Sequence, residues 1–199
     1  MTQKTQLSFV LFLLSTMTLF GQYSMEVTAN YNIASSSEFN EQFKNGYGGN
    51  MEIIYQFEET GFGASILFGL NGFRAEQSYE QKLTDNNSTI FTYEYKINYY
   101  SFPLMAQGKY TFFREKDFNI LAAIGLGMEF MELKEKQFGK YTSDYRKEKF
   151  NEFAIYPNIG LSYKLVPDVD VVLKSGYHKT FGKKSLSYID IKLGLIYKI

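Results

Sequence analysis

Few side chains in this sequence are capable of acid–base or nucleophilic chemistry. His178 is the only histidine, and without cysteine there is no thiol nucleophile, thiolate metal ligand or lipid attachment site. Ser185 and Ser187 follow His178 closely, so a Ser–His pair is conceivable. A nucleophile, its base and an orienting group must meet within hydrogen-bond reach, and no nucleophile elbow or similar spacing occurs here. The sequence therefore predicts no catalytic residue, and we expect His178 to be a hydrogen-bonded interior or rim residue.

The sequence also lacks the usual motifs for cofactors and metals. It contains no phosphate-binding loop, no calcium loop and no metal-ligand cluster, so we expect no cofactor and no metal site. Lys plus Arg number 21 and Asp plus Glu number 21, which gives a formal net charge of zero. A nucleic-acid-binding chain would need a basic excess, so we expect no nucleic-acid partner.

Charged and amide side chains occupy alternate positions in segments whose other positions are apolar. These polar positions include Glu26, Glu52, Gln107, Lys109, Asn158, Asp170, Lys174, Asp190 and Lys192. Acids and bases both occur among them, and a buried charge without a partner is costly. We therefore expect Glu26, Glu52, Asp170, Lys174, Asp190 and Lys192 to pair with one another and fill an interior; the alternative is that the polar-phase charges line a narrow conducting pore.

A second group of charges lies in residues 134–149, which the sequence predicts to be a long loop. The group contains six cations and three acids, namely Lys134, Lys136, Lys140, Arg146, Lys147, Lys149, Glu135, Asp144 and Glu148. With Lys183 and Lys184, these cations would face anionic lipopolysaccharide or a surface partner, unless the loop is simply solvated. Aromatic residues of the predicted loops leave room for protein recognition; they are Phe39, Phe43, Tyr79, Phe138, Tyr141 and Tyr145.

The elements that position these side chains are predicted by period-2 alternation, which indicates two-faced β-strands. The predicted strands are residues 23–33, 47–57, 61–73, 90–113, 118–133, 153–165, 169–179 and 188–199. In residues 90–113 the apolar phase slips at Tyr99–Tyr100, which predicts a β-bulge near Pro103, since proline in a strand belongs at a bulge or an edge. The alternative is a tight hairpin at Phe102–Pro103, which would make nine strands.

The lengths of the connections favour eight strands in an all-β antiparallel up-and-down barrel. Short links are predicted at 58–60, 114–117 and 166–168, long ones at 34–46, 74–89 and 134–149, and an intermediate one at 181–186. Short and long links alternate only if residues 90–113 form a single strand. Short turns at one rim and long loops at the other are typical of transmembrane barrels.

The distribution of glycine and aromatic residues favours a barrel in lipid over a soluble lipocalin-like carrier. Eight glycines share the polar phase, where they would leave room for charged side chains in a narrow lumen; they are Gly61, Gly63, Gly69, Gly125, Gly127, Gly160, Gly176 and Gly194. On the apolar phase, aromatic residues lie near both strand ends, as Phe153 and Tyr163 do. Ten strand residues at ~40° tilt project to about 25 Å, the height of the apolar band of such barrels.

The beginning of the chain predicts export from the cytoplasm. Lys4 precedes an apolar stretch over residues 7–20, which is shorter than the roughly 20 residues that a membrane-spanning helix needs. This pattern is typical of a secretory signal peptide. We expect a signal peptide at residues 1–21 and a barrel domain at residues 22–199.

One segment resembles a known family. Tyr100-Ser101-Phe102-Pro103-Leu104, followed by Lys109-Tyr110, is similar to the aromatic-x-x-Pro-Leu…Lys-Tyr strand of the PorT-like small outer-membrane β-barrel proteins of Bacteroidetes. Residues 120–127, 158–163 and 193–197 resemble later strands of the same family. The resemblance implies an eight-stranded barrel in a Gram-negative outer membrane, and its short motifs single out no secretion role.

These observations together predict a non-enzymatic outer-membrane protein that anchors in lipid and recognises surface partners through its loops. We expect a monomer whose partners are outer-membrane lipid, lipopolysaccharide and a surface or secretion-system protein. The alternatives are a narrow channel or small-solute transporter, an outer-membrane lipid enzyme that uses His178, and a soluble periplasmic lipocalin-like binder.

Overall fold

The computed structural model describes residues 21–35, 45–57, 60–74, 79–84, 90–113, 116–138, 143–182 and 185–199. Nine β-strands lie within these ranges: β1 (Gly21–Ala34), β2 (Asn45–Phe57), β3 (Phe62–Arg74), β4 (Tyr79–Thr84), β5 (Ile90–Phe112), β6 (Phe118–Phe138), β7 (Ser143–Val166), β8 (Val169–Phe181) and β9 (Ser187–Lys198). Among the described residues, no helix has the length and apolar character needed to cross a membrane.

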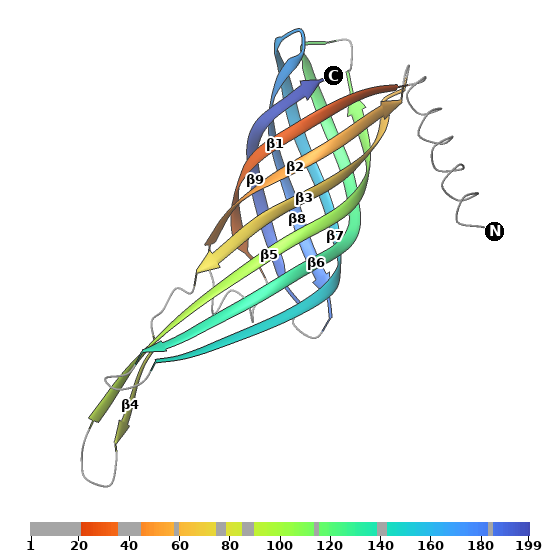
Figure 1. The fold of residues 1–199 in the computed structure, drawn as a ribbon. Coiled ribbons are helices and arrows are strands. Elements are labelled where there is room, and N and C mark those ends of the chain that lie inside the picture. Colours follow the sequence, from red (N-terminus) through yellow and green to blue (C-terminus); the bar gives the residue numbers. More distant parts are fainter. Residues whose placement is uncertain are drawn as a thin grey trace, which may run out of the picture.

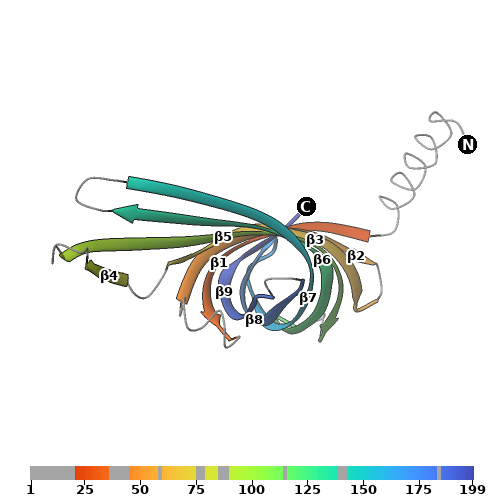
Figure 2. The same cartoon turned by 90° about the horizontal axis from the view of Figure 1, so that it is seen from below.

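Eight of the strands in the described ranges form a closed antiparallel barrel (Figures 1 and 2). Sequential neighbours pair along the sheet, β1 pairs with β9, and β3 pairs with β5 to close it. β4 pairs with β5 alone and lies outside the ring. The predicted up-and-down barrel of eight strands is therefore confirmed. Here the rim that bears the short β2–β3, β5–β6 and β7–β8 turns is called the turn end, and the opposite rim the loop end.

The predicted β-bulge at Tyr99–Tyr100 is wrong, and so is the alternative hairpin at Phe102–Pro103. β5 is one strand, and its register with β6 runs without a shift from Glu94↔Phe138 to Phe112↔Ile120. The apolar phase changes for another reason. Ile97 and Tyr99 point inward at the loop end and pack in an apolar cluster there, whereas nearer the turn end most apolar side chains of β5, such as Leu104, point outward.

Pro103 lies neither at a bulge nor at an edge, but in a barrel strand with neighbours on both sides. It pairs with Glu129 of β6, while the ladder to β3 is interrupted between Phe68↔Leu104 and Asn71↔Ser101. Proline has no N–H to donate, so the break in the ladder falls at its position. Pro157 of β7 lies in a similar gap of the ladder to β8.

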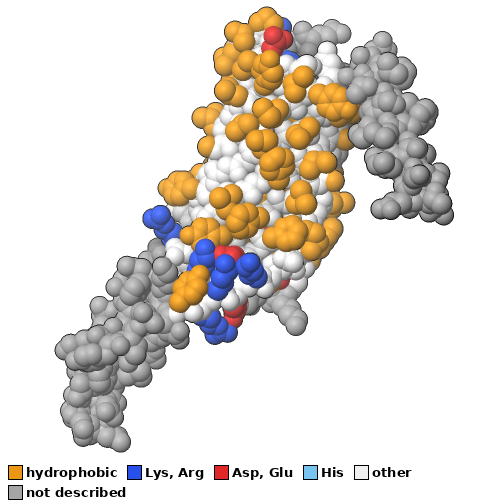
Figure 3. All heavy atoms as spheres, in the orientation of Figure 1, with side chains coloured by type: hydrophobic (Ala, Val, Ile, Leu, Met, Phe, Trp, Pro, Cys, Tyr) orange, Lys and Arg blue, Asp and Glu red, His pale blue; other side chains and the backbone are white. Residues whose placement is uncertain are grey.

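Apolar side chains cover the outer surface of the barrel (Figure 3). Four mid-height side chains are exposed by the following fractions: Ile53 49%, Ile124 52%, Leu161 40% and Leu193 60%. A water-soluble carrier would bury these residues in its interior, so the lipocalin-like alternative is wrong. The exposed rings of Phe102, Phe130 and Phe153 lie on this surface towards the loop end, and we call these three residues the aromatic girdle.

Glycines of the lumen make room for larger neighbours, as predicted. Gly160 of β7 and Gly176 of β8 are both buried on the inward phase. A Cβ atom at Gly176 would collide with the ring of Tyr156, and one at Gly160 would lie 2.5 Å from Cγ of Lys174. Both are separations that real side chains do not tolerate, so these two positions require glycine because of what lies opposite them.

Three strands continue well beyond the rest of the barrel. β5, β6 and β7 have 23, 21 and 24 residues, whereas β2, β3 and β8 have 13 each. Their loop-end halves, with β4, project away from the ring (Figures 1 and 2). The prediction that residues 134–149 form a loop is therefore wrong: β6 continues to Phe138 and β7 begins at Ser143. Outside lipid neither strand face needs to be apolar, so the alternation that reveals strands in the sequence is lost there.

The predicted signal peptide falls almost wholly outside the described residues. Gly21, which the predicted boundary assigns to that peptide, is the first residue of β1 and pairs with Phe57. The division of the chain at residues 21 and 22 stays a prediction.

Candidate functional site

The lumen near mid-height holds a cluster of four buried charges from four strands. Lys174 of β8 lies 2.5 Å from Glu26 Oε2 and 3.1 Å from Glu52 Oε2. Lys109 of β5 lies 2.7 Å from Glu52 Oε1 and 3.9 Å from Glu26 Oε2. Two carboxylates thus share two ammonium groups, which compensates charges that would be costly to bury singly. The predicted pairing of Glu26, Glu52 and Lys174 is confirmed, and Lys109 joins them.

A second polar cluster surrounds His178 towards the loop end. The imidazole is stacked between the rings of Tyr156 and Tyr188, with centroid separations of 4.0 and 4.6 Å. Its Nδ1 lies 3.6 Å from Glu129 Oε2, and its Nε2 lies 3.8 Å from Asp190 Oδ2. The tyrosine hydroxyls donate to the same two acids, Tyr188 to Glu129 at 3.1 Å and Tyr156 to Asp190 at 3.0 Å. The stacked rings and the paired acids fill the lumen at this level.

His178 is an interior residue, as predicted, and faces acids and aromatic rings. Ser185 donates instead to the carbonyl oxygen of Thr180 at 2.9 Å. The His178 side chain is 1% exposed, so a substrate has no direct access to it. Within the described ranges, no group of three or more His, Cys, Asp or Glu side chains is placed to hold a metal ion.

Sequence reasoning missed several residues that fill the lumen. Glu129 is fully buried and accepts hydrogen bonds from Ser101 and Tyr188. Glu152 accepts one from Thr180 at 2.7 Å. Glu129 stands on the inward phase of the predicted segment 118–133, so the alternation was the available signal, whereas Glu152 lies one residue before the predicted segment 153–165. Tyr156 stands on the same inward phase as Asn158 and Gly160, so the alternation was the available signal for it as well.

The loop end of the lumen is closed by apolar side chains. We call this group the apolar plug; its buried members are Ala34, Phe73, Tyr99, Met131, Leu186 and Tyr188. Ile97, Leu133 and Phe150 pack against them. The ring of Phe73 contacts those of Tyr99 and Tyr188 edge-on, at centroid distances of 6.0 and 5.4 Å. The interior is therefore apolar at its loop end, whereas towards the turn end its buried charges and amides alternate with smaller apolar clusters, such as that of Leu121, Val172 and Ile196.

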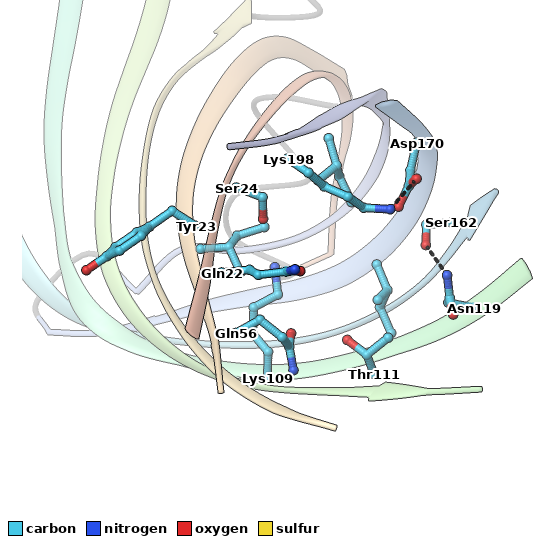
Figure 4. Close-up of a pocket in the computed structure, with 13 residues that line it drawn as sticks. Gln22, Tyr23, Ser24, Gln56, Lys109, Thr111, Asn119, Ser162, Asp170 and Lys198 are labelled. Atoms are coloured by element: carbon cyan, nitrogen blue, oxygen red, sulfur yellow. Dashed lines mark hydrogen bonds and ion pairs between the residues drawn. The ribbon is translucent and has the colours of Figure 1, made fainter. Parts of the chain in front are cut away.

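The turn end contains a cavity of about 180 Å³ that is lined by both polar and apolar side chains (Figure 4). Gln56, Lys109 and Thr111 are among the residues that line it. At its sides, Lys198 donates to Asp170 at 2.8 Å, and Asn119 donates to Ser162 at 3.5 Å. Lys109 also belongs to the mid-height charge cluster, so the cavity ends where that cluster begins.

Outward-facing charges gather beside the aromatic girdle, over β6 and β7 (Figure 3). We call this group the outer basic patch; it consists of Glu132, Lys134, Lys147 and Lys149. The Glu132 carboxylate lies 2.8 Å from Lys134, 2.8 Å from Lys147 and 3.9 Å from Lys149. Hydrogen bonds from Lys134 and Lys147 lower the pKa of the Glu132 carboxyl to about 2, and the bond to Glu132 raises the pKa of Lys134.

Other predicted surface residues are placed only in part. Tyr145 is exposed on the projecting part of β7, and Arg146 pairs with Glu148 at 2.5 Å. The remaining predicted loop residues lie outside the described ranges or in strand parts whose side chains are not described: Phe39, Phe43, Tyr79, Lys136, Phe138, Lys140, Tyr141, Asp144, Lys183 and Lys184.

Comparison with known proteins identifies the family of this barrel. The model of the outer membrane protein beta-barrel domain family matches residues 7–198. The chain belongs to this family. It is a small integral outer-membrane β-barrel protein, located in the cell outer membrane. A comparison with curated protein sequences gives no match.

Solved outer-membrane barrels share the fold of this family member at low sequence identity. Neisserial surface protein A matches with a TM-score of 0.53 and 14% identity, over 89% of this chain and 97% of that chain. A major outer membrane protein from Thermus thermophilus has a TM-score of 0.58 and 11% identity, over 90% and 99% of the two chains. OprG from Pseudomonas aeruginosa has a TM-score of 0.54 and 10% identity, over 90% and 96%.

Proposed function

We propose that this family member is a non-conducting, non-enzymatic anchor that presents a recognition surface above the outer membrane. The observation that carries the proposal is the projecting sheet, formed by β4 and the loop-end parts of β5, β6 and β7 beyond the aromatic girdle. In outer-membrane barrels the longer loops lie on the extracellular side, so this sheet would extend away from the cell.

The projecting sheet has an edge suited to contact with another protein. Before Phe153, β7 pairs with β6 but with no other described strand, because the ladder to β8 starts at Phe153↔Phe181. Tyr145, Arg146 and Lys149 are exposed along this stretch. An open edge offers backbone hydrogen-bonding groups to a partner, while its charged side chains limit non-specific pairing.

A shortened variant tests whether the projecting sheet is separate from the anchor. Glu132 and Lys149 face each other across β6 and β7, so residues 133–148 are replaced by Asn-Gly, a two-residue hairpin turn. We expect the variant to form a barrel. Its mobility in SDS gels should still differ between unheated and heated samples. Failure to form a barrel would show that the extension belongs to the folding unit, which contradicts the proposed division.

Recognition is tested by photo-crosslinking in intact cells. A photoreactive residue at Tyr145 should form a discrete adduct, whereas the same residue at Lys116, which is exposed at the turn end, should not give that adduct. Absence of an adduct at Tyr145, or the same adduct at both positions, would overturn the recognition role.

The non-conducting part of the proposal rests on the filled lumen. The mid-height charge cluster, the ring stack around His178 and the apolar plug follow one another from the turn end to the loop end. An eight-stranded barrel leaves little space once its side chains are placed. We expect no steady single-channel steps in planar bilayers; such steps would favour the narrow channel or small-solute transporter instead.

The non-enzymatic part has its own test. Lipid turnover by the purified protein in vesicles is measured before and after His178→Ala. We expect no turnover in either case. Turnover that is lost in the variant would make the protein an outer-membrane lipid enzyme.

The finer family assignment is part of the same proposal. The segment Tyr100–Leu104 and the pair Lys109-Tyr110 support a PorT-like protein of Bacteroidetes. A monomer is proposed as well, with a surface or secretion-system protein as the partner of the projecting sheet. Crosslinked adducts from the Tyr145 experiment, identified by mass spectrometry, would test the partner directly.

A further inference from the structure

The outer basic patch carries a positive excess at a defined height on the barrel. Three lysines share the single carboxylate of Glu132, so the four side chains have a formal net charge of plus two. Glu132 is the most buried of the four, with a side-chain exposure of 16%, while Lys147 and Lys149 are 39% and 70% exposed. The carboxylate thus holds the ammonium groups together, and each ammonium has three donors, so N–H groups remain for another acceptor.

The register of the strands places the patch just past the apolar surface. On β6, Glu132 follows Phe130 of the aromatic girdle by two residues, and it pairs with Lys149 of β7. Lys134 pairs with Lys147 one step further out. Two to four strand residues correspond to about 7–13 Å along a strand, or roughly 5–10 Å along the normal at ~40° tilt. The polar headgroup layer is about 5–7 Å thick on each side of the hydrocarbon, so the patch reaches into this layer.

The patch is also held against the outer face of the barrel. The ammonium of Lys134 lies 4.7 Å from the ring centroid of Tyr100 on β5, a cation–π contact. Together with the bonds to Glu132, this contact keeps Lys134 on the lipid-facing side rather than over the lumen. The cations therefore lie on the side of the barrel that faces the membrane. They are farther from the membrane centre than the exposed rings of Phe102 and Phe130, which the acyl chains contact.

We propose that the outer basic patch is a binding site for the phosphate groups of lipid A in the outer leaflet. The loop end faces the extracellular leaflet, and lipid A is the phosphorylated lipid of that leaflet in Gram-negative bacteria. Lys147 and Lys149 bind a phosphate, Lys134 and Glu132 hold them in place, and the aromatic girdle packs against the acyl chains. The site is independent of any ligand of the projecting sheet.

Lipid retention tests the site. The protein is reconstituted in nanodiscs of phosphatidylcholine with a small fraction of bisphosphorylated lipid A, extracted in mild detergent and weighed by native mass spectrometry. Lys147→Gln/Lys149→Gln removes the positive excess but leaves the Lys134–Glu132 pair. We expect the retained lipid A to fall roughly tenfold, since each surface lysine contributes several-fold to attraction by anionic lipid.

A matched control removes two cations from the other end of the barrel. Lys116→Gln/Lys164→Gln removes the same amount of charge as Lys147→Gln/Lys149→Gln, but at two exposed turn-end positions. This variant should retain as much lipid A as the unmodified protein. Gel mobility before and after heating confirms that both variants are folded barrels. Equal retention by both double variants would overturn the proposal.

Three further measurements distinguish the source of the phosphate. The unmodified protein should retain dephosphorylated lipid A poorly. Its retention should match the low retention of intact lipid A by Lys147→Gln/Lys149→Gln. Phosphatidylglycerol retained as well as lipid A would reduce the site to general attraction of anions and overturn the assignment to lipid A. Inorganic phosphate at millimolar concentration should not displace the lipid, because it lacks the acyl chains; displacement would show that the site takes free phosphate.

Discussion

The two sides of the aromatic girdle have opposite arrangements of polar and apolar side chains. Towards the turn end, β6 presents Ile124 and Leu126 to lipid, while the lumen beside it holds buried charges and amides together with a few apolar side chains such as Leu121. Beyond the girdle the same strand presents Glu132 and Lys134 outward and turns Met131 into the apolar plug. The ladder to β7 continues across this inversion without a shift in register.

This contrast teaches that the surroundings, not the backbone, decide which strand face is apolar. Within the bilayer the outer face must be apolar, so the polar groups gather inside and need partners. Beyond it the outer face meets headgroups and water, and the inner face forms a small conventional core. The predictions below test the two regions against each other, beginning with the largest expected effect.

Removal of a buried cation should be most damaging within the membrane. Lys174→Met leaves Glu26 and Glu52 with Lys109 as their remaining cation in the cluster, and we expect a loss of about 3–5 kcal/mol in the free energy of unfolding. Urea unfolding in phosphatidylcholine vesicles, followed by circular dichroism, measures it. Lys198→Met, whose side chain is 38% exposed beside Asp170, should cost about 1 kcal/mol or less. Equal losses would mean that the lumen is as well solvated as its rim.

Truncation of the apolar plug should destabilise the loop end as it would a soluble core. Phe73→Ala removes a buried ring that contacts Tyr99 and Tyr188, and we expect a loss of about 3 kcal/mol in the same unfolding assay. Phe68→Ala, on the outer face of the same strand, is the control. Its loss should be smaller because lipid chains fill the space of the ring. A larger loss for Phe68→Ala would contradict the description of the plug as a core.

A methyl group added to a strand glycine should be costly only where a large side chain lies opposite. Gly176→Ala drives a Cβ into the Tyr156 ring, and we expect a loss of about 1–3 kcal/mol. Gly108→Ala lies on the exposed outer face of β5, where nothing is within 4 Å of the new Cβ, and should change the free energy of unfolding by about 0.5 kcal/mol or less. Similar losses at both positions would indicate a general glycine requirement in these strands rather than close packing.

The smallest effect is expected from protonation of the outer basic patch. The pKa of Glu132 is about 2 in the folded protein, below its ordinary value, so its stabilising effect is complete above about pH 4.5 and is lost as the pH falls towards 2. Carbon NMR of the Glu132 carboxyl should titrate near pH 2 at low salt. In Lys134→Gln/Lys147→Gln the midpoint should rise towards the ordinary value. A midpoint near pH 4.5 in the unmodified protein would show that these ion pairs do not form in solution.

Much of the barrel could be predicted from the sequence because lipid imposes period-2 alternation. The predicted segments agree with β1, β2, β3, β8 and β9 within two residues at each end. The same alternation placed Glu52, Lys109 and Lys174 in the lumen. It could not show which acid pairs with which base, because the partners lie up to 148 residues apart, as Glu26 and Lys174 do.

The errors concentrate where lipid ends. The phase change at Tyr99–Tyr100 was interpreted as a bulge because the sequence does not show where the outside of the strand passes from lipid to water. The projecting parts of β6 and β7 were interpreted as a loop because charged residues on both faces remove the alternation. In the structure these parts are held by an unbroken ladder from Phe118↔Tyr163 to Phe138↔Ser143.

The sequence by itself determined the number of barrel strands, their inward and outward faces and the membrane as their solvent. These properties follow from the order of polar and apolar residues along each strand, which is local information. Only the tertiary structure decided the ion pairs of the lumen, the apolar plug, the projecting sheet and the outer basic patch. Each of them depends on register between strands, and register arises only when the barrel closes.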